Sequence, residues 1–488
     1  MDAAELGLWG DATAESHSGK YAGAMRLSRL TELRLTAFKS FREAVLPLGD
    51  TTILIGRNSA GKSNALDGLE VLARLAEGDD LVDALDGRRR ASGTVRGGSA
   101  GCAPHGADRF TLGCTVRCDA DDSRGYEDYV YDVTIEVRPD LRIVAERLQG
   151  PGVAVKSGKR SYGPLVETRQ PGVPGIGIEA EIHNGKRGLN PPHTFRDSRL
   201  LISQVPLAVA GVNRAEESVL EGVTAVLLAL RGVFHLDPVP HLMRGFVPAR
   251  DDELRRTGEN VSAALHALQR RDTVAFDRVQ ELAAQIADER IGGIDFVRSD
   301  LGDVMVALDE DFGPDGESGR TPAREMSDGL LRFVAIATAL LSSGHGLDVD
   351  VSVGARTAVD DGGDTTRGGV LIVLEELENG LHSSQARRVL DLVRSSAAVP
   401  GTQVLVTTHS PAILDAAEGE LSENVVLCSR EPGTGYSTMT RLVDLPGYTR
   451  AIAASSLGQA VTSGRLTEAV RSEPQSSYDE FERLLGMQ

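Results

Sequence analysis

Aromatic side chains and long apolar runs are both scarce in this chain of 488 residues. Aromatic residues make up 4% of it, with a single Trp, and no stretch of about 18 apolar residues could form a membrane-spanning helix. Residues 1–23 lack the charged and apolar segments of a secretory signal. We therefore expect a flexible extension over 1–26 and a cytoplasmic protein that contacts no membrane. Hydrophobic residues still make up 41%, enough for a sizeable core.

Cysteine is scarce as well, since only Cys102, Cys114, Cys118 and Cys428 occur. Cys114 and Cys118 have an even spacing, which puts both side chains on one face of a strand. A zinc site would need a second pair of ligands, for which Cys102 and His105 are the nearby candidates. We favour the alternative, in which the cysteines are reduced structural thiols of a cytosolic protein.

Basic residues are fewer than acidic residues, with 52 Lys and Arg against 71 Asp and Glu. The formal net charge of −19 argues against a protein that coats nucleic acid, because neutralising phosphates requires clustered Lys and Arg. Two arginine-rich stretches, 88–90 and 244–271, leave a local DNA-binding track possible. We favour the alternative that both are ordinary solvated surfaces.

The pattern of apolar residues predicts an α/β protein. Residues 51–56 and 369–376 are apolar runs of the kind that forms parallel strands buried on both faces. Three segments with alternating character predict a β-meander over 110–148. Residues 85–107 are rich in Arg, Gly and Ser, so we expect a disordered loop there. Helices are expected over about 62–76, 213–232, 259–289 and 326–343.

The strongest motif is GRNSAGKSN, which starts at Gly56 and lies between a predicted strand and a predicted helix. It matches G-x-x-x-x-G-K-[ST] in the context that this pattern requires. Its glycines let backbone N–H groups surround a β-phosphate, and the helix N-terminus adds a partial positive charge. Lys62 is expected to reach the β- and γ-phosphates, and Ser63 to offer its hydroxyl to Mg²⁺. The predicted ATP-binding residues of this loop are Gly56, Arg57, Asn58, Ser59, Ala60, Gly61, Lys62, Ser63 and Asn64.

A second motif ends the apolar run VLIVL with two carboxylates, Glu375 and Glu376. This pattern is typical of a Walker B strand. Glu375 is the candidate partner of the metal, although Asp is more common at its position, and Glu376 is the candidate base that polarises the attacking water.

Two further motifs complete the predicted site. His409 directly follows the apolar strand QVLVTT and is a candidate sensor of the γ-phosphate. Ser327 and Gly329 lie at the start of the helix near 326–343, where N–H groups favour an anion. Because the P-loop already supplies one helix N-terminus, this second one suits a γ-phosphate held by another subunit.

The order of these motifs resembles that of a known family. GRNSAGKSN, MSDGLLRF, LIVLEELENGLH and TTHSP together resemble the RecF/SMC-like and OLD-like ABC-type ATPases, most closely those of bacterial anti-phage defence systems of the OLD, Gabija, Septu and PARIS types. LRLTAFKSF resembles the first strand of that family. The resemblance covers 27–76, 325–343 and 369–415, and Leu377 and Ser383 depart from it at positions where Pro is usual. No Q-loop residue can be assigned, although Gln204 is a candidate.

The resemblance implies a P-loop ABC-type head with an inserted β-rich lobe and a helical segment. We expect an N-terminal part of the head with the β-meander at 27–150, an inserted region at 151–300, a C-terminal part of the head at 301–430 and a helical tail at 431–488.

The implied function is an ATPase that uses ATP and Mg²⁺, forms a homodimer or higher homo-oligomer on ATP, and switches a separate effector protein encoded by a neighbouring gene. Association with DNA is possible. The alternatives are a RecF-like repair ATPase and an OLD-type nuclease. The residues after His409 contain no Asp-x-Asp, and the pair Asp348 and Asp350 precedes the Walker B strand, so we expect no Toprim nuclease domain.

Overall fold

A computed structural model provides the structure. It describes residues 26–88, 93–119, 125–169, 177–186, 190–287, 291–311, 318–342, 346–349, 366–379, 382, 385–417, 421–446, 448 and 455–463. Residues 1–25 of the predicted N-terminal extension, Asp350 and most of the helical tail lie outside these residues. The predicted domain limits stay predictions.

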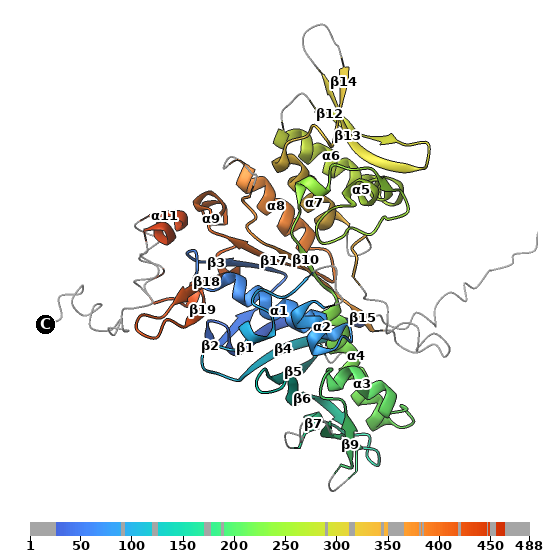
Figure 1. The fold of residues 1–488 in the computed structure, drawn as a ribbon, viewed down its shortest axis with the longest axis vertical. Coiled ribbons are helices and arrows are strands. Elements are labelled where there is room, and N and C mark those ends of the chain that lie inside the picture. Colours follow the sequence, from blue (N-terminus) through green and yellow to red (C-terminus); the bar gives the residue numbers. More distant parts are fainter. Residues whose placement is uncertain are drawn as a thin grey trace, which may run out of the picture.

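Fifteen of the described strands form one sheet, which consists of a parallel half and an antiparallel half. In the parallel half the order is β10-β16-β17-β3-β18. In the antiparallel half β2, β1 and β4 to β9 follow one another as a meander (Figure 1). The strands of this sheet are β1 Arg26–Phe38, β2 Phe41–Pro47, β3 Thr51–Ile55, β4 Arg109–Asp119, β5 Tyr126–Glu136, β6 Arg142–Val153, β7 Arg160–Thr168, β8 Ile178–Ile182, β9 Pro192–Phe195, β10 Val233–Leu236, β15 Thr366–Gly368, β16 Val370–Leu374, β17 Thr402–Thr408, β18 Val425–Arg430 and β19 Ser437–Arg441.

The parallel strands are buried on both faces, as their unbroken apolar runs predict. Successive residues of a strand point to opposite faces, and they enter two separate cores. In β3, Leu54 packs into the core beside the meander, whereas Ile53 and Ile55 pack into the core beneath the helices on the other side. The sheet thus separates the two cores.

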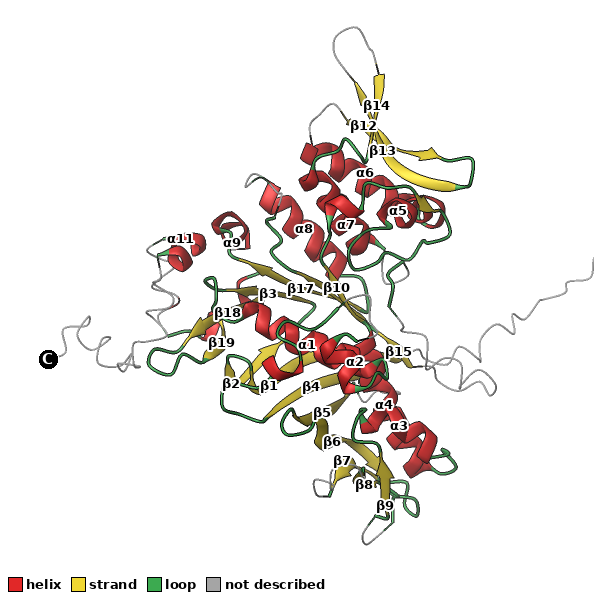
Figure 2. Cartoon of the chain, viewed as in Figure 1, coloured by secondary structure: helices red, strands yellow, loops and turns green. Residues whose placement is uncertain are grey.

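Helices cover both faces of the parallel half of the sheet (Figure 2). Helix α1 lies between the parallel strands and the meander, with α4 beside it (Figure 1). Helices α5 to α8 cover the opposite face, together with a small sheet of order β11-β13-β12 in which β14 pairs with β13. The helices are α1 Lys62–Ala76, α2 Leu81–Asp86, α3 Leu201–Ala208, α4 Arg214–Arg231, α5 Val261–Arg271, α6 Thr273–Ala287, α7 Asp328–Leu341, α8 Ala386–Ala397, α9 Pro411–Ala417 and α11 Leu457–Thr462, and the small sheet consists of β11 Val247–Pro248, β12 Ile291–Arg298, β13 Asp303–Asp311 and β14 Ser318–Pro322.

The mixed α/β fold and the meander over 110–148 are confirmed, but the prediction of a disordered loop over 85–107 was wrong for its described part. Val95 and Cys102 are buried, and Cys102 accepts a backbone hydrogen bond from Lys39. Gly97 and Gly98 have φ values of 87° and 58°, which only glycine adopts readily, and these turns fold the segment back onto the molecule. Composition suggested a loop because the residues that permit such turns are also common in disordered chains.

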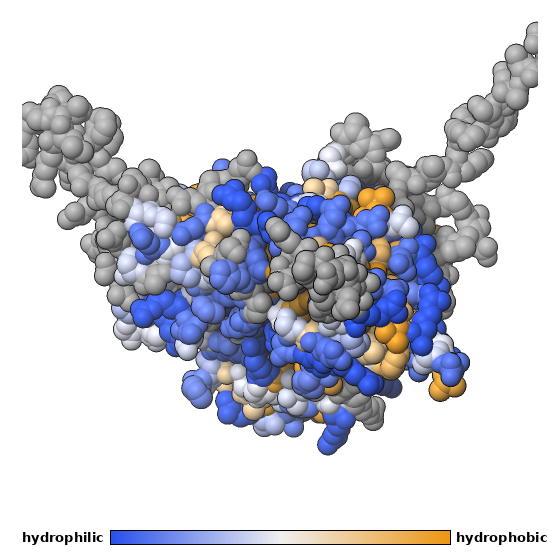
Figure 3. Space-filling view, turned by 90° about the horizontal axis from the view of Figure 1, so that it is seen from above, coloured by the Kyte–Doolittle hydropathy of each residue, from blue (hydrophilic) through white to orange (hydrophobic). Residues whose placement is uncertain are grey.

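One face of the molecule is mainly polar (Figure 3). Seen from above, the face over the helical side is mainly hydrophilic, with smaller hydrophobic patches (Figure 3). Among the described helices, none is long and apolar enough to cross a membrane. The four cysteines, all of them described, are buried and form no disulfide. The described residues contain no group of three or more His, Cys, Asp or Glu that could hold a metal ion.

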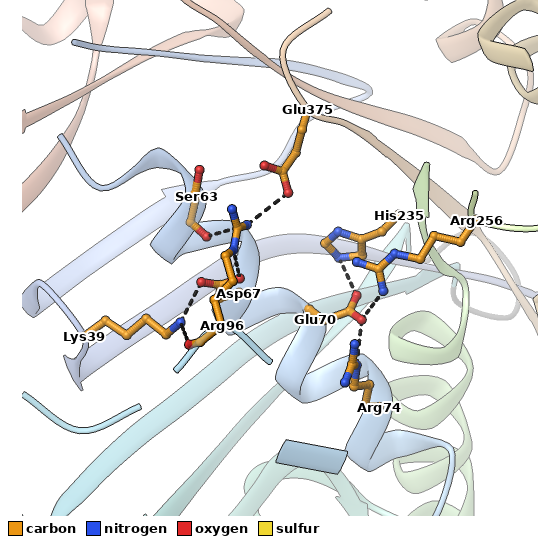
Figure 4. A network of polar contacts seen from close by, with 9 residues as sticks. All are labelled: Lys39, Ser63, Asp67, Glu70, Arg74, Arg96, His235, Arg256 and Glu375. Carbon is orange, nitrogen blue, oxygen red and sulfur yellow. Dashed lines mark hydrogen bonds and ion pairs between the residues drawn. The ribbon is translucent and has the colours of Figure 1, made fainter. Parts of the chain in front are cut away.

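Helix α1 is enclosed on almost every side, so its charged residues must find partners inside the protein. Glu70 accepts hydrogen bonds from Arg74, at 2.7 Å, and from Arg256 (Figure 4). The Nε2 atom of His235 lies 3.2 Å from the Glu70 carboxylate. Although burial opposes it, the positive charges of His235, Arg256 and Arg74 lower the pKa of Glu70 to about 2. Burial lowers the pKa of His235 to about 4.

The buried His235 predicts that acid destabilises the fold. The ordinary pKa of histidine is 6.5, and that of His235 in the folded chain is about 4. Between these two pH values the unfolded chain binds a proton at His235 and the folded chain does not. The unchanged chain should therefore lose about 2–3 kcal/mol of stability relative to a His235→Gln chain between pH 7 and pH 4.5. Urea midpoints of both chains at the two pH values measure this difference.

Glu146 is another buried group that titrates in this range. Burial raises the pKa of Glu146 to about 7, so Glu146 contributes a pH dependence of opposite sign. Both chains carry Glu146, and their difference isolates His235. If the difference in stability between the two chains is the same at pH 7 and at pH 4.5, His235 does not cause the loss of stability in acid.

Candidate nucleotide site

The P-loop connects β3 to α1 and passes close to the neighbouring strands. Gly56 and Gly61 have φ values of 154° and 121°. A Cβ atom at Gly56 would lie 2.3 Å from the Cys428 carbonyl oxygen, and one at Gly61 would lie 2.5 Å from the Ser437 hydroxyl. Ser437 also donates a hydrogen bond of 2.5 Å to the Ala60 carbonyl. The two glycines are thus required both by backbone conformation and by the close approach of β18 and β19.

The loop borders a cavity of about 430 Å³ at the carboxyl ends of the parallel strands. Most of the sequence-predicted P-loop residues and the predicted base line this cavity together. Its lining residues are Asn58, Ser59, Ala60, Gly61, Lys62, Ser63, Asn64, Glu376, Thr407 and Arg430. Such a crevice is the usual ligand site of an open α/β sheet.

Lys62 is the buried cation of this cavity. Its side chain is only 9% exposed, and its Nζ donates to the Gly56 carbonyl at 2.7 Å. Burial lowers the pKa of Lys62, while the nearby charges of Glu376 and Glu378 oppose that effect. Lys62 therefore places its amine between the loop backbone and the carboxylates that follow β16.

Glu376 is held in a strained turn. Its φ of 48° lies in the left-handed region, which costs a residue other than glycine on the order of 1–3 kcal/mol. Its backbone N–H donates to the Thr407 hydroxyl at 3.0 Å, and Asn379 donates to its Oε2 at 2.7 Å. Strand β17 and the residues after β16 thus fix both the main chain and the carboxylate of Glu376 at the edge of the cavity.

Glu375 does not line the cavity, and Arg96 covers its carboxylate. Arg96 donates to Glu375 Oε1 at 3.1 Å, to Asp67 at 2.8 Å and to the Ser63 carbonyl at 3.4 Å (Figure 4). Lys39 donates to the other oxygen of Asp67 at 2.6 Å. Burial raises the pKa of Glu375, and Arg96 opposes this shift. Sequence reasoning missed Arg96, which comes from the segment expected to be disordered.

His409 follows β17 but is likewise absent from the cavity lining. Its backbone N–H donates to Glu378 Oε1 at 2.7 Å, and its Nδ1 lies 2.8 Å from the same oxygen. The His409 side chain is 46% exposed and that of Glu378 is 14% exposed. The sequence placed the histidine near the site but gave no sign of its carboxylate partner.

Ser327 and Gly329 lie at the N-terminus of α7. Below, we call these two residues the signature motif and α7 the signature helix. The Ser327 hydroxyl caps this helix by accepting from the Leu330 N–H at 3.3 Å, and Ser327 is exposed. Neither Ser327 nor Gly329 lines the P-loop cavity of the same chain. Arg57 is exposed and also lies outside the lining.

The two remaining sequence candidates have structural roles. Gln204 uses its amide for hydrogen bonds to the backbone of Arg196, Arg199 and Leu200, which fold the segment before α3. In the stretch 244–271, arginines pair with acidic side chains of the same chain. These pairs are Arg244–Asp328, Arg255–Glu259, Arg256–Glu70 and Arg271–Asp252. This pairing agrees with the interpretation as ordinary surface.

Residues that the sequence did not suggest also line the cavity. Thr407 lies at the end of β17, and Arg430 at the end of β18 donates from Nε to the Ser59 carbonyl at 2.7 Å. Strand order could have suggested both, because β17 and β18 flank β3.

Comparisons with known proteins found a family match over part of the chain. Residues 235–415, less than half of the chain, match the family model described as "AAA domain, putative AbiEii toxin, Type IV TA system". That range contains Ser327, Glu375, Glu376 and His409. Among curated proteins, none matches the sequence.

Solved structures of SMC heads are similar to this chain. The SMC head domain from Thermotoga maritima is 13% identical, with 85% of this chain and 98% of that chain covered and a TM-score of 0.36. The Smc head of Pyrococcus furiosus with an extended coiled coil, bound to the C-terminal domain of ScpA, is 12% identical, with 85% and 96% covered and a TM-score of 0.39. An SmcHead bound to the C-winged helix domain of ScpA is 14% identical, with 84% and 97% covered and a TM-score of 0.42.

The described chain is thus a mixed α/β protein with a P-loop cavity at the edge of its parallel strands, and its residues 235–415 match an AAA-domain family.

Proposed function

We propose that this chain binds and hydrolyses ATP in the P-loop cavity and that two chains close each site. The observation that carries the proposal is the convergence of Lys62 and Glu376 on one cavity from sequence-distant segments. A buried lysine beside a loop of backbone N–H groups suits a polyphosphate. A carboxylate fixed at the edge of the same cavity suits a water molecule that attacks the γ-phosphate.

The residues divide the work of hydrolysis between charge and orientation. Lys62 neutralises charge on the β- and γ-phosphates, while the N-terminus of α1 adds its partial positive charge. Glu376 accepts a hydrogen bond from the attacking water and takes up its proton. Since Thr407 and Asn379 hold Glu376, little reorganisation is needed at that step.

The residues also fit Mg²⁺, which prefers oxygen ligands. The Ser63 hydroxyl lines the cavity, and the Glu375 carboxylate is joined to the Ser63 segment through Arg96. Ser63 would bind the ion directly. Glu375, which lies outside the cavity lining and is paired with Arg96, would act through water. The ion would offset the charge of the phosphates.

The signature helix supports the requirement for two chains. Ser327 and Gly329 lie outside the chain's own cavity, and an exposed N-cap can meet a phosphate only on another surface. We propose that ATP joins two heads so that α7 of each faces the P-loop of the other. In this role the protein is a switch whose ATP state controls a separate effector protein, in anti-phage defence or in a process associated with DNA.

A direct assay tests the activity and its limits. The purified chain should release phosphate from ATP in the presence of Mg²⁺ but leave plasmid DNA intact in Mg²⁺ or Mn²⁺. Cutting should require the product of a neighbouring gene. If the chain cuts plasmid alone, and the activity survives in Glu376→Gln but is lost on mutation of Asp348 and Asp350, a nuclease function replaces this proposal.

A further inference from the structure

Glu378 has a carboxylate beside the P-loop cavity, and this carboxylate has no role in the hydrolysis proposed above. It lies in the turn after β16, two residues beyond Glu376. A single oxygen, Oε1, accepts the His409 backbone N–H at 2.7 Å and lies 2.8 Å from the ring Nδ1. One carboxylate atom therefore fixes both the main chain and the ring of His409.

The second oxygen of Glu378 shows that this arrangement is not optimal for stability. Oε2 is buried and has no hydrogen-bond partner among the residues that the structure describes. An unsatisfied buried polar atom costs on the order of 1–3 kcal/mol. The charge of Glu378 also acts on Lys62, which places it near the P-loop. A carboxylate with an unpaired buried oxygen beside a cavity is a candidate for a group that serves the chemistry of the site.

The contact determines which ring nitrogen of His409 is available. Nδ1 lies against a carboxylate oxygen and must carry its hydrogen toward it, so Nε2 is left for other contacts. To donate to a phosphate oxygen, Nε2 must also carry a hydrogen, and the Glu378 carboxylate at Nδ1 then faces the ring on its other side. Without Glu378 the ring would lose both its orientation and its counter-charge.

We propose that Glu378 is a positioning residue that orients the His409 ring so that Nε2 faces the γ-phosphate. This inference rests on the proposed ATPase function. His409 is the group that touches the nucleotide, and Glu378 acts only through it.

Steady-state hydrolysis by the full-length chain tests the pair. Glu378→Ala and His409→Ala should each lower kcat by about 10- to 100-fold, with little change in KM, and the double variant should be no slower than either. Glu378→Gln keeps an acceptor for Nδ1–H but loses the charge, and should recover part of the loss. Glu423→Ala, which removes an exposed carboxylate, is the matched control and should match the unchanged chain.

Two outcomes would overturn the inference. In one, Glu378→Ala turns over ATP at the unchanged rate. In the other, the two single losses multiply in the double variant, which would show that the residues act independently. A merely structural role for Glu378 would lower the melting temperature and affect KM as well as kcat.

A measurement without turnover separates this inference from the function on which it rests. In chain labelled with ¹⁵N-histidine, the His409 signals can be assigned by their loss in His409→Ala. We expect a ring protonated at Nδ1 in the unchanged chain and a loss of that preference in Glu378→Ala. If the chain fails to hydrolyse ATP but shows this pattern, the proposed function is wrong and the pairing stands. If the tautomer is the same in both chains, the positioning role is refuted.

Discussion

A Glu376→Gln chain is expected to bind Mg²⁺ and ATP as tightly as the unchanged chain but to hydrolyse ATP about 100- to 10,000-fold more slowly. The amide has the size of the carboxylate, and its oxygen can still accept the hydrogen bond from Asn379. It cannot take up the proton of the attacking water. The rate of phosphate release and the affinity for a fluorescent ATP analogue measure the two effects separately.

The control for this experiment is Glu423→Gln, which makes the same chemical change at an exposed site. It should leave both binding and turnover unchanged. If Glu376→Gln hydrolyses ATP at the unchanged rate, the base of the reaction is another group and the role of the strained turn must be abandoned.

Ser327→Arg should abolish turnover while leaving ATP binding by a single chain nearly intact. Ser327 is exposed and lines no part of its own cavity, so a large cation there should block only the approach of a second head. In Glu376→Gln, ATP should shift the chain from monomer to dimer in light scattering. Adding Ser327→Arg, which puts an arginine in both sites of the dimer, should weaken this shift far more than the single arginine of a mixed dimer does.

Loss of the helix cap is a separate effect of any change at Ser327, because its hydroxyl accepts the Leu330 N–H. Ser327→Ala removes the cap without adding bulk and serves as the control. It should cost about 1 kcal/mol of stability but keep the ATP-dependent dimer. If Ser327→Ala also fails to dimerise, the effect of Ser327→Arg comes from loss of the helix cap and not from a blocked interface.

The parts of the site that could be predicted from sequence are those encoded by short local patterns. Gly56 to Ser63 lie between a strand and a helix, and the run that ends in Glu376 has the composition of a doubly buried strand. Their chemistry requires particular residue types at fixed spacing. The structure places Lys62 and Glu376 at one cavity because β3 and β16 are both neighbours of β17 in the parallel sheet.

The remaining features depend on contacts between distant segments, which local patterns do not encode. Arg96 reaches Glu375 across 279 positions of the sequence. Glu378 binds His409 across 31 positions. The buried charges of α1 were also missed, since Asp67 and Glu70 look like the polar face of an exposed helix until the two halves of the sheet enclose it.

Mixing two inactive chains tests most directly the central claim that two heads form each ATP site. Lys62→Ala removes the phosphate-binding cation of one chain, and Ser327→Arg removes the signature surface of the other. A mixed dimer then contains one intact P-loop facing one intact signature helix. The account predicts that each protein alone is inactive and that their mixture, with both proteins folded, recovers ATP hydrolysis. A mixture that stays inactive would contradict the account and point to a site built within a single chain.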